Sequence, residues 1–378
     1  MKVLVTGGAG FIGSWLVDSL LQKDHSVTIV DNLSPQIHGE MASLDLSKLK
    51  DNRQSVDFIH ADIRNMEAMD KALAQSDAVV HLAAETGTGQ SMYQVAHYYD
   101  VNQQATAAMF EAIVTKHRHI KRVVLASSRA IYGEGAYLLD KQVFVPGSRD
   151  PLRLQNGQFE PLGPNGELIS LIATPENSLP SPASIYAATK LANESLGRIM
   201  AEAYGLTVVA LRFQNVYGER QSLRNPYTGI LSIFSNRMRQ NLPINIFEDG
   251  QESRDFIHVS DVVRSIQLAL EKELPRFTVA NVGSGIPTTV WEVANLLRKL
   301  LNSSSQLYIS GDFRSGDIRH CYADMAIAEK QLDFRSSIDI KSGLKVFSEW
   351  VMTQPLLVDR SVEAMAELTK LGLGKCRE

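Results

Sequence analysis

The chain has 378 residues, of which 44% are hydrophobic and 21% are charged, as expected for a globular protein with two domains or one large one. A formal net charge of −4 and a pI near 6.2 give no basic field, so nucleic acid and anionic membranes are not expected partners. Cys321 and Cys376 match neither a metal-ligand spacing nor a disulfide framework, which favours a reducing compartment and no bound metal. No apolar run approaches the roughly 20 residues of a membrane helix, and the first predicted strand starts at Lys2 without room for a signal peptide, so a cytoplasmic protein is expected.

The first predicted elements are a strand, a glycine-rich turn and a helix. The apolar run 2–6 leads directly into the glycines of 7–13, after which apolar residues recur at helical spacing as far as Leu20. Glycine lets such a turn bend tightly, approach a pyrophosphate without a Cβ and pack its helix close to the strand. The helix N-terminus would present N–H groups and a positive dipole end to the anion. The pattern therefore predicts a dinucleotide-binding turn.

A second strand, 26–31, ends in an acid. Asp31 lies eighteen residues after Gly13, where a carboxylate can accept hydrogen bonds from the adenosine ribose and repel a 2′-phosphate. This position favours NAD over NADP.

Strands and helices keep alternating as far as residue 126. Strands are predicted at 56–60, 78–82 and 122–126, with helices ending at Ala74 and spanning 102–116. Such βαβ repetition predicts an α/β fold of the Rossmann type, a doubly wound parallel sheet with ligands at the carboxyl ends of its strands.

The region from about 135 to 182 breaks this alternation. It is rich in proline and glycine, and we expect an inserted loop region that is either functional or partly disordered. A helix at 185–203 and a strand at 206–212 follow; shorter strands are predicted at 244–247 and 255–259, with helices at 261–271, 290–301 and 361–371. We expect residues 1–213 to form the dinucleotide-binding domain, with segments near 255–280 returning to it, and 214–378 to form mainly a smaller C-terminal α/β domain that binds the substrate.

A chemical motif stands at the start of the 185–203 helix. Tyr186 and Lys190 are four residues apart and therefore face the same way. A cation near the phenol would favour a tyrosinate, since an unperturbed tyrosine is a poor base at neutral pH. Ser128, at the carboxyl end of a predicted strand, could hydrogen-bond the same substrate oxygen.

Together these residues resemble the extended short-chain dehydrogenase/reductase family, and within it the NAD-dependent nucleotide-sugar epimerase/dehydratase branch. The match covers nearly the whole chain, with T-G-G-x-G-F-I-G at 6–13, H-L-A-A at 81–84, S-S-x-x-[VI]-Y-G at 127–133 and Y-x-x-[ST]-K at 186–190. The resemblance implies NAD as the cofactor and Ser128, Tyr186 and Lys190 as the catalytic residues. It implies the following NAD-contacting residues: Gly7, Gly10, Phe11, Ile12, Gly13, Asp31, Asn32, Asp62, Ile63, Leu82, Ala83, Ala84, Asn102, Tyr186, Lys190 and Phe213.

The second half resembles the sugar-nucleotide module of that family, with L-R-x-x-N-V-Y-G at 211–218, R-D-[FY]-I-H-V at 254–259 and R-x-G-D at 314–317. Two arginines on a diphosphate make physical sense, because the guanidinium fork stays charged and offers several donors. Arg319 and His320 lie close in sequence but rank below Arg314. The substrate residues that the resemblance implies are Thr86, Ser128, Asn215, Arg254, Arg314 and Asp317.

Three residues indicate the reaction within the branch: Arg129 and Ala130, which differ from the dehydratase pattern, and Asp31, which matches NAD binding. Family dehydratases carry an acidic pair after the strand-end hydroxyl, where this chain has Arg129 and Ala130, so the proton donor for dehydration is missing. Asp31 argues against a reductase that prefers NADPH. The remaining chemistry is transient oxidation, which predicts a nucleotide-sugar epimerase acting at C4.

The substrate is indicated by a local resemblance. The loop 85–92 and the long insertion resemble the subgroup that contains dTDP-L-rhamnose 4-epimerases, which points to a dTDP-6-deoxyhexose. That subgroup often carries C-P-x-C-G in the insertion, whereas this chain has no cysteine at 162–166, so no zinc knuckle can form. The insertion must be held in another way or be mobile.

Other functions stay open at this stage. They are a reductase or decarboxylase of the same branch and a catalytically idle NAD-binding scaffold. The resemblance also implies a homodimer formed through helices near 93–116 and 185–203.

Overall fold

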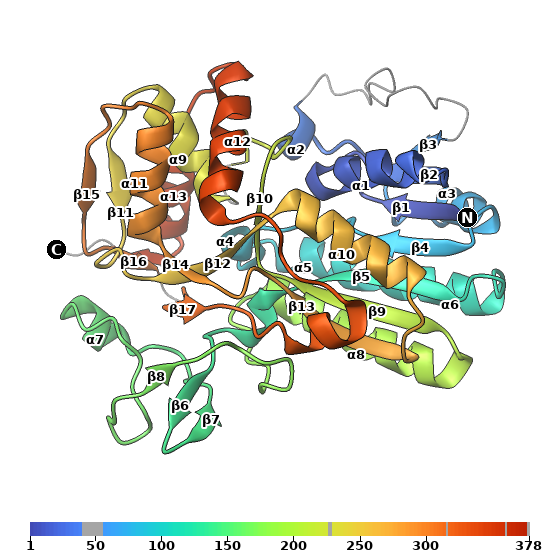
Figure 1. The fold of residues 1–378 in the computed structure, drawn as a ribbon, viewed down its shortest axis with the longest axis horizontal. Helices are drawn as coiled ribbons and strands as arrows, with labels where there is room; N and C mark the ends of the chain where they lie inside the picture. Colours follow the sequence, from blue (N-terminus) through green and yellow to red (C-terminus); the bar gives the residue numbers. More distant parts are fainter. Residues whose placement is uncertain (40–55, 226–228, 315–316, 360, 376–378) are drawn as a thin grey trace.

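The computed structural model describes residues 1–39, 56–225, 229–314, 317–359 and 361–375, so Cys376 lies outside the described residues. Its largest element is a seven-stranded parallel sheet with the strand order β13-β9-β5-β4-β1-β2-β3 (Figure 1). The strand order reverses between β1 and β4, which is where a doubly wound sheet opens a crevice for a ligand. The strands are β1 (Lys2–Thr6), β2 (Ser26–Asp31), β3 (Val56–His60), β4 (Ala78–His81), β5 (Arg122–Ser128), β9 (Thr207–Phe213) and β13 (Phe277–Val282).

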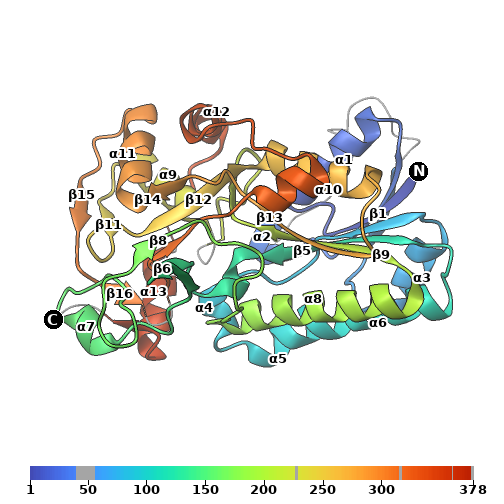
Figure 2. The same ribbon diagram turned by 60° about the horizontal axis from the view of Figure 1, so that its bottom comes forward.

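Helices cover both faces of this sheet (Figure 2). On one face α1 (Phe11–Gln22) and α10 (Val259–Glu271) pack together and bury Leu16, Val17 and Ile266 against the strands. On the other face lie α3 (Met66–Ala74), α6 (Ala105–Thr115) and α8 (Ile185–Tyr204), with Met109 and Ile113 in their core. The central strands are buried on both sides, which explains their continuous apolar runs.

This architecture confirms the predicted doubly wound α/β fold, and most predicted elements agree with the structure within two residues. The helix expected at 102–116 begins later, because 99–104 form a wider π-helical turn, η3 (Tyr99–Gln104), before α6. Strand β13 was missed. Among the described residues no helix is both long and apolar enough to cross a membrane.

A smaller α/β lobe is built mainly from the second half of the chain (Figure 1). It contains a four-stranded sheet, a β-pair and helices that share an apolar core around Phe256, Leu297 and Phe347. Strand β13 and helix α10 instead join the large sheet, whereas the boundary predicted at residue 213 stays a prediction. The elements of this lobe are β10 (Asn215–Tyr217), β12 (Ser253–His258), β14 (Pro287–Thr289), β17 (His320–Cys321), β11 (Ile244–Ile246), β15 (Leu307–Ile309), α9 (Ile230–Arg239), α11 (Val290–Leu300), α12 (Ile340–Thr353) and α13 (Ser361–Lys370).

The insertion at 135–182 has more regular structure than its composition predicts. It forms a three-stranded antiparallel sheet of β6 (Tyr137–Leu139), β7 (Gln142–Phe144) and β8 (Ser170–Leu171). The short helix α7 (Pro151–Gln155) lies between β7 and β8 in the chain. Leu154 and Phe159 of the insertion pack against Phe313 of the smaller lobe. These contacts hold the insertion against the lobe and could not be read from local sequence.

A buried ion pair links the strands below Ser128. Arg212 on β9 donates from Nε and Nη2 to the carboxylate of Glu194 on α8, at 3.0 and 2.8 Å, and both side chains are 6% exposed. Ser127 donates to the same carboxylate, and Arg212 Nη1 donates to Tyr132 Oη and to the carbonyl oxygen of Glu176, both at 2.8 Å. This network joins β5, β9, α8 and the end of the insertion.

Removing the cation from this pair is expected to destabilise the whole sheet. In Arg212→Met the carboxylate of Glu194 stays buried without its partner, so the free energy of unfolding should fall by about 3–5 kcal/mol. Arg198→Met, which breaks the exposed pair with Glu202 on the same helix, should change it by less than about 1 kcal/mol. Urea unfolding followed by circular dichroism measures both, and equal losses would contradict a special role for the buried pair.

Candidate functional site

A cavity of about 350 Å³ opens at the carboxyl edge of the large sheet, at β1 and β4, between which the strand order reverses. It is lined by every predicted NAD-contacting residue except Asn102, by the catalytic set and by Thr86. The lining residues predicted from the sequence are Gly7, Gly10, Phe11, Ile12, Gly13, Asp31, Asn32, Asp62, Ile63, Leu82, Ala83, Ala84, Thr86, Ser128, Tyr186, Lys190 and Phe213.

The glycine turn forms one wall of the cavity. Gly7 has φ of +70°, and a Cβ there would lie 2.7 Å from the backbone nitrogen of Ala83. A Cβ on Gly13 would collide with the carbonyl oxygen of Gly7 and lie 2.7 Å from Gly8 Cα. Gly10 caps α1 without a side-chain hydrogen bond, which leaves the helix N-terminus to an anion. The turn is therefore a close-packed cradle that suits a pyrophosphate.

Asp31 lies deep in the cavity at the end of β2. Its Oδ2 accepts a hydrogen bond from Ala9 N at 3.0 Å and its Oδ1 accepts one from Leu33 N at 2.8 Å. His38, which sequence reasoning missed, lines the same cavity with Nε2 4.0 Å from Asp31 Oδ1. A fixed carboxylate with lone pairs to spare suits ribose hydroxyls.

Asp62 also lines the cavity, next to Asn32. Its carboxylate accepts a hydrogen bond from Asn32 Nδ2 at 3.1 Å and pairs with Arg64 at 2.8 Å. The hydrogen bond to Arg64 outweighs partial burial and lowers the pKa of Asp62 to about 2, so this carboxylate stays ionised at physiological pH.

The predicted catalytic residues meet at the other end of the cavity. Helix α8 begins at Ser184, whose side chain accepts a hydrogen bond from Ala187 N, and its first turns carry Tyr186 and Lys190. Burial raises the pKa of the Tyr186 phenol, and a hydrogen bond with Ser128 and the positive charge of Arg129 offset this rise only in part. Lys190 Nζ lies 5.8 Å from the centre of the Tyr186 ring and donates to the carbonyl oxygen of Ala126 at 2.9 Å. Burial lowers the pKa of Lys190 to about 8.

Arg129 is the unforeseen member of this group. The sequence marked it only as the residue that replaces an acid, yet its charge acts on Tyr186. Its Nε donates to Asn215 Oδ1 at 3.1 Å, and among the described residues it forms no ion pair. Burial lowers the pKa of Arg129, and the like charge of Arg254 adds to that effect. A guanidinium with donors to spare therefore lies near both the Tyr186 phenol and Arg254.

Asn102 lies beneath the cavity and not among the described residues that line it. Its side chain accepts a hydrogen bond from Glu85 N at 2.8 Å and donates to Glu85 O and to Thr189 Oγ1, at 3.0 and 3.2 Å. These bonds tie the loop after β4 to helix α8. A direct contact of Asn102 with the cofactor stays a prediction.

The other predicted substrate residues lie outside the described lining. Asn215 accepts from Arg129, Arg254 donates to backbone carbonyl oxygens, and Asp317 offers its carbonyl oxygen to Arg149 at 2.8 Å. Arg314 stacks over the ring of Phe247 at 4.8 Å, and its buried Nε has no hydrogen-bond partner among the described residues. Asn215 and Arg254 thus belong to one connected group around Arg129.

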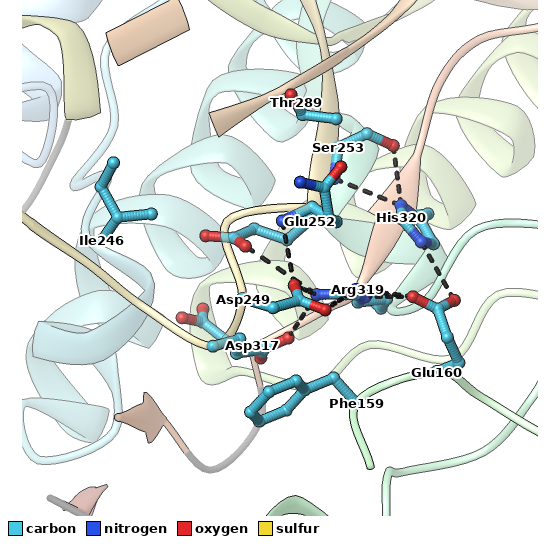
Figure 3. Close-up of polar contacts among 12 residues, drawn as sticks. Phe159, Glu160, Ile246, Asp249, Glu252, Ser253, Thr289, Asp317, Arg319 and His320 are labelled. Atoms are coloured by element: carbon cyan, nitrogen blue, oxygen red, sulfur yellow. Dashed lines mark hydrogen bonds and ion pairs between the residues drawn. The ribbon is translucent and has the colours of Figure 1, made fainter. Parts of the chain in front are cut away.

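Arg319 has a different environment from these arginines. Its side chain is 1% exposed and is surrounded by carboxylates, as Figure 3 shows. Its donors are used by Glu160, Glu248 and Asp249, so the low ranking of Arg319 as an anion-binding residue agrees with its contacts.

Comparisons with known proteins agree with this geometry. The model of the NAD dependent epimerase/dehydratase family matches residues 3–150 and 161–283. A dTDP-L-rhamnose 4-epimerase from Burkholderia thailandensis is 33% identical over 353 residues, which cover 93% of this chain and 94% of that protein. A UDP-glucuronate 4-epimerase from Thermodesulfobacterium geofontis is 29% identical, with 92% and 95% covered.

Solved structures give the same result. The UDP-glucuronic acid 4-epimerase from Bacillus cereus, in complex with UDP-glucuronic acid and NAD, has a TM-score of 0.75 and 26% identity, and 93% of this chain and 99% of that chain are covered. The chain belongs to the NAD dependent epimerase/dehydratase family. Its predicted family and cofactor are thereby confirmed, and it is an epimerase that uses NAD.

The glycine cradle gives a direct test of the cavity as the NAD site. Gly13→Ala should lose bound NAD and lower the melting temperature, because the new Cβ collides with backbone atoms that cannot move aside. Gly147→Ala is the matched control, since a Cβ there meets nothing within 4 Å. NAD released from denatured protein and measured by chromatography gives the readout. Wild-type NAD content in folded Gly13→Ala would place the cofactor elsewhere.

Proposed function

We propose that this protein inverts C4 of a nucleotide sugar, and that its substrate is a dTDP-6-deoxyhexose. The observation that carries the proposal is the grouping of a half-buried Tyr186 phenol, its Ser128 partner and a nearby cation at the end of a dinucleotide-type cavity. The relative with 33% identity over nearly the whole chain, a dTDP-L-rhamnose 4-epimerase, supports the choice of substrate over the UDP sugars of relatives with 29% identity.

The residues of this chain supply binding and proton transfer. Tyr186 Oη takes the proton from the C4 hydroxyl, and Ser128 donates a hydrogen bond to the same sugar oxygen. The positive charges of Arg129 and Lys190 hold the phenolate that accepts this proton. The glycine turn and Asp31 would hold NAD in the cavity, where it would supply a reversible hydride acceptor for C4.

Inversion then requires only that the oxidised sugar ring rotate between removal of the C4 hydrogen and its return. The diphosphate stays anchored, with Arg254 and Arg314 as the proposed cations, while the ring presents its other face. Tyr186 gives the proton back to the C4 oxygen. Water is not eliminated, since Arg129 and Ala130 provide no acid at the positions where dehydratases carry one.

Removing the phenol hydroxyl tests the proton acceptor. Tyr186→Phe should lower kcat by roughly 10³-fold or more while NAD stays bound, because the ring still fills its place but accepts no proton. Conversion of dTDP-L-rhamnose without added NAD, followed by chromatography, measures it. Tyr204→Phe, at the exposed end of the same helix, is the control and should retain full activity. Turnover by Tyr186→Phe at the wild-type rate would remove Tyr186 from this role.

The pH profile tests the charge of Arg129. The acidic limb of kcat against pH follows deprotonation of Tyr186, and loss of a nearby cation raises that pKa, so Arg129→Met should move this limb upward by roughly 1 pH unit. Arg198→Met should leave the profile unchanged. An unshifted limb in Arg129→Met would mean that another group holds the phenolate.

A further inference from the structure

Arg254 is held by backbone oxygens and not by an acid. Its Nη1 donates to the carbonyl oxygens of Ser253 and Arg319, both at 2.9 Å, and its Nη2 donates to that of Ile318 at 2.8 Å. No ion pair of Arg254 exists among the described residues. Its charge therefore stays available to an anion, while the segment 318–319 sets the direction of its guanidinium.

Glu134 fixes the backbone of that segment. Its carboxylate accepts a hydrogen bond from Arg319 N at 2.7 Å and one from His320 N at 2.6 Å, and the residue is 6% exposed. Tyr137 Oη donates to the same carboxylate at 3.1 Å. Glu134 directly precedes the insertion, and Tyr137 begins its first strand. The start of the insertion thus determines where the carbonyl oxygens that hold Arg254 point.

The Arg319 side chain anchors the same segment through carboxylates of the smaller lobe and the insertion (Figure 3). It bonds both oxygens of Asp249, at 2.7 and 2.9 Å, and Glu248 Oε2 at 3.0 Å, all in the smaller lobe. It also donates from Nε to Glu160 Oε1 of the insertion at 2.7 Å. Although burial opposes the charged form, these carboxylates raise the pKa of Arg319 above its usual value, so it is a permanent cation.

Two further contacts complete this connection. Arg149 of the insertion pairs with Glu248 at 2.8 Å and donates to the carbonyl oxygen of Asp317 at 2.8 Å. His320 Nε2 lies 3.3 Å from Glu160 Oε2, and its Nδ1 is 2.8 Å from Ser253 Oγ. The insertion therefore contacts both sides of segment 318–319.

We infer that the insertion is a working part of the substrate site: Glu134, Glu160 and Arg319 act as positioning residues that aim Arg254 at the substrate diphosphate. The inference rests on the proposed function, which makes Arg254 a diphosphate ligand. The insertion is held without a zinc knuckle, because ion pairs and buried hydrogen bonds attach it to the smaller lobe.

The charges around Arg319 explain why a guanidinium is needed at this position. Glu160, Glu248 and Asp249 surround the Arg319 guanidinium, beside the segment whose carbonyl oxygens hold Arg254, and without that cation their negative charge would disfavour a diphosphate. Arg319 offsets part of this charge and bonds both oxygens of Asp249, which a lysine cannot reproduce because its ammonium is a point charge. Loss of Arg319 should weaken diphosphate binding more than it affects the chemical step.

The experiment measures binding of UDP and dTDP to the NAD-loaded full chain by calorimetry. Arg319→Met should weaken both by roughly tenfold or more and raise KM for dTDP-L-rhamnose, with kcat and NAD content retained. Arg319→Lys should lie between it and wild type. Arg335→Met is the matched control, because its side chain is 79% exposed and pairs with Glu329 at the surface.

Glu160→Gln keeps the inference testable if Arg319→Met fails to fold. Glu160 is 58% exposed, so this change does not leave a buried charge, and it should weaken UDP binding by roughly threefold. Wild-type UDP affinity in folded Arg319→Met, or in Glu160→Gln, would overturn the inference, as would a loss of kcat with KM unchanged. If the wild type bound neither UDP nor dTDP, the nucleotide-sugar proposal itself would be wrong, and the inference with it.

Discussion

A series of buried hydrogen bonds beneath the cavity holds β1, β4, α6 and α8 together, and the residues of the site depend on these elements for their positions. His81 at the end of β4 bridges Thr6 Oγ1 on β1 at 2.8 Å and Thr106 Oγ1 on α6 at 2.9 Å. Burial lowers the pKa of His81 to about 3, so the ring stays neutral and its two bonds persist at any physiological pH. The imidazole therefore ties α6 to the carboxyl ends of β1 and β4, where the strand order reverses. Asn193 on α8 donates to the carbonyl oxygen of Asn102, which also accepts from Thr106, and so places the helix that carries Tyr186.

Two cations, Lys190 and Arg129, lie near the Tyr186 phenol. The sequence suggested Lys190 as the charge beside the phenol, and its Nζ does lie over the Tyr186 ring while one donor is used by Ala126 O. The charge that lowers the pKa of Tyr186 in the structure is that of Arg129. Arg129 also lies close enough to Arg254 for the two like charges to interact, so two cations are near the phenol. Such an arrangement favours an anionic ligand and partly offsets the burial that raises the pKa of the phenol.

The sequence predicted what depends on local pattern. The β1-α1-β2 unit, its glycine turn and Asp31 follow from periodicity and backbone constraints within a short stretch, and the structure has them where they were expected. The environment of the insertion was not predictable, because it depends on pairs such as Glu160 and Arg319, which are 159 residues apart. Charged residues at such distances carry no periodic signal. His38 was missed for a similar reason, since a lone histidine after a strand is no pattern.

The central claim is that one buried site removes and restores the C4 hydrogen without releasing it to water. The direct test is to incubate the purified protein, without added NAD, with dTDP-L-rhamnose that carries deuterium at C4, and to follow the product by mass spectrometry and NMR. The account predicts a C4 epimer of unchanged mass that retains its deuterium at C4. Loss of deuterium to solvent, or a product lighter by one water, would contradict it.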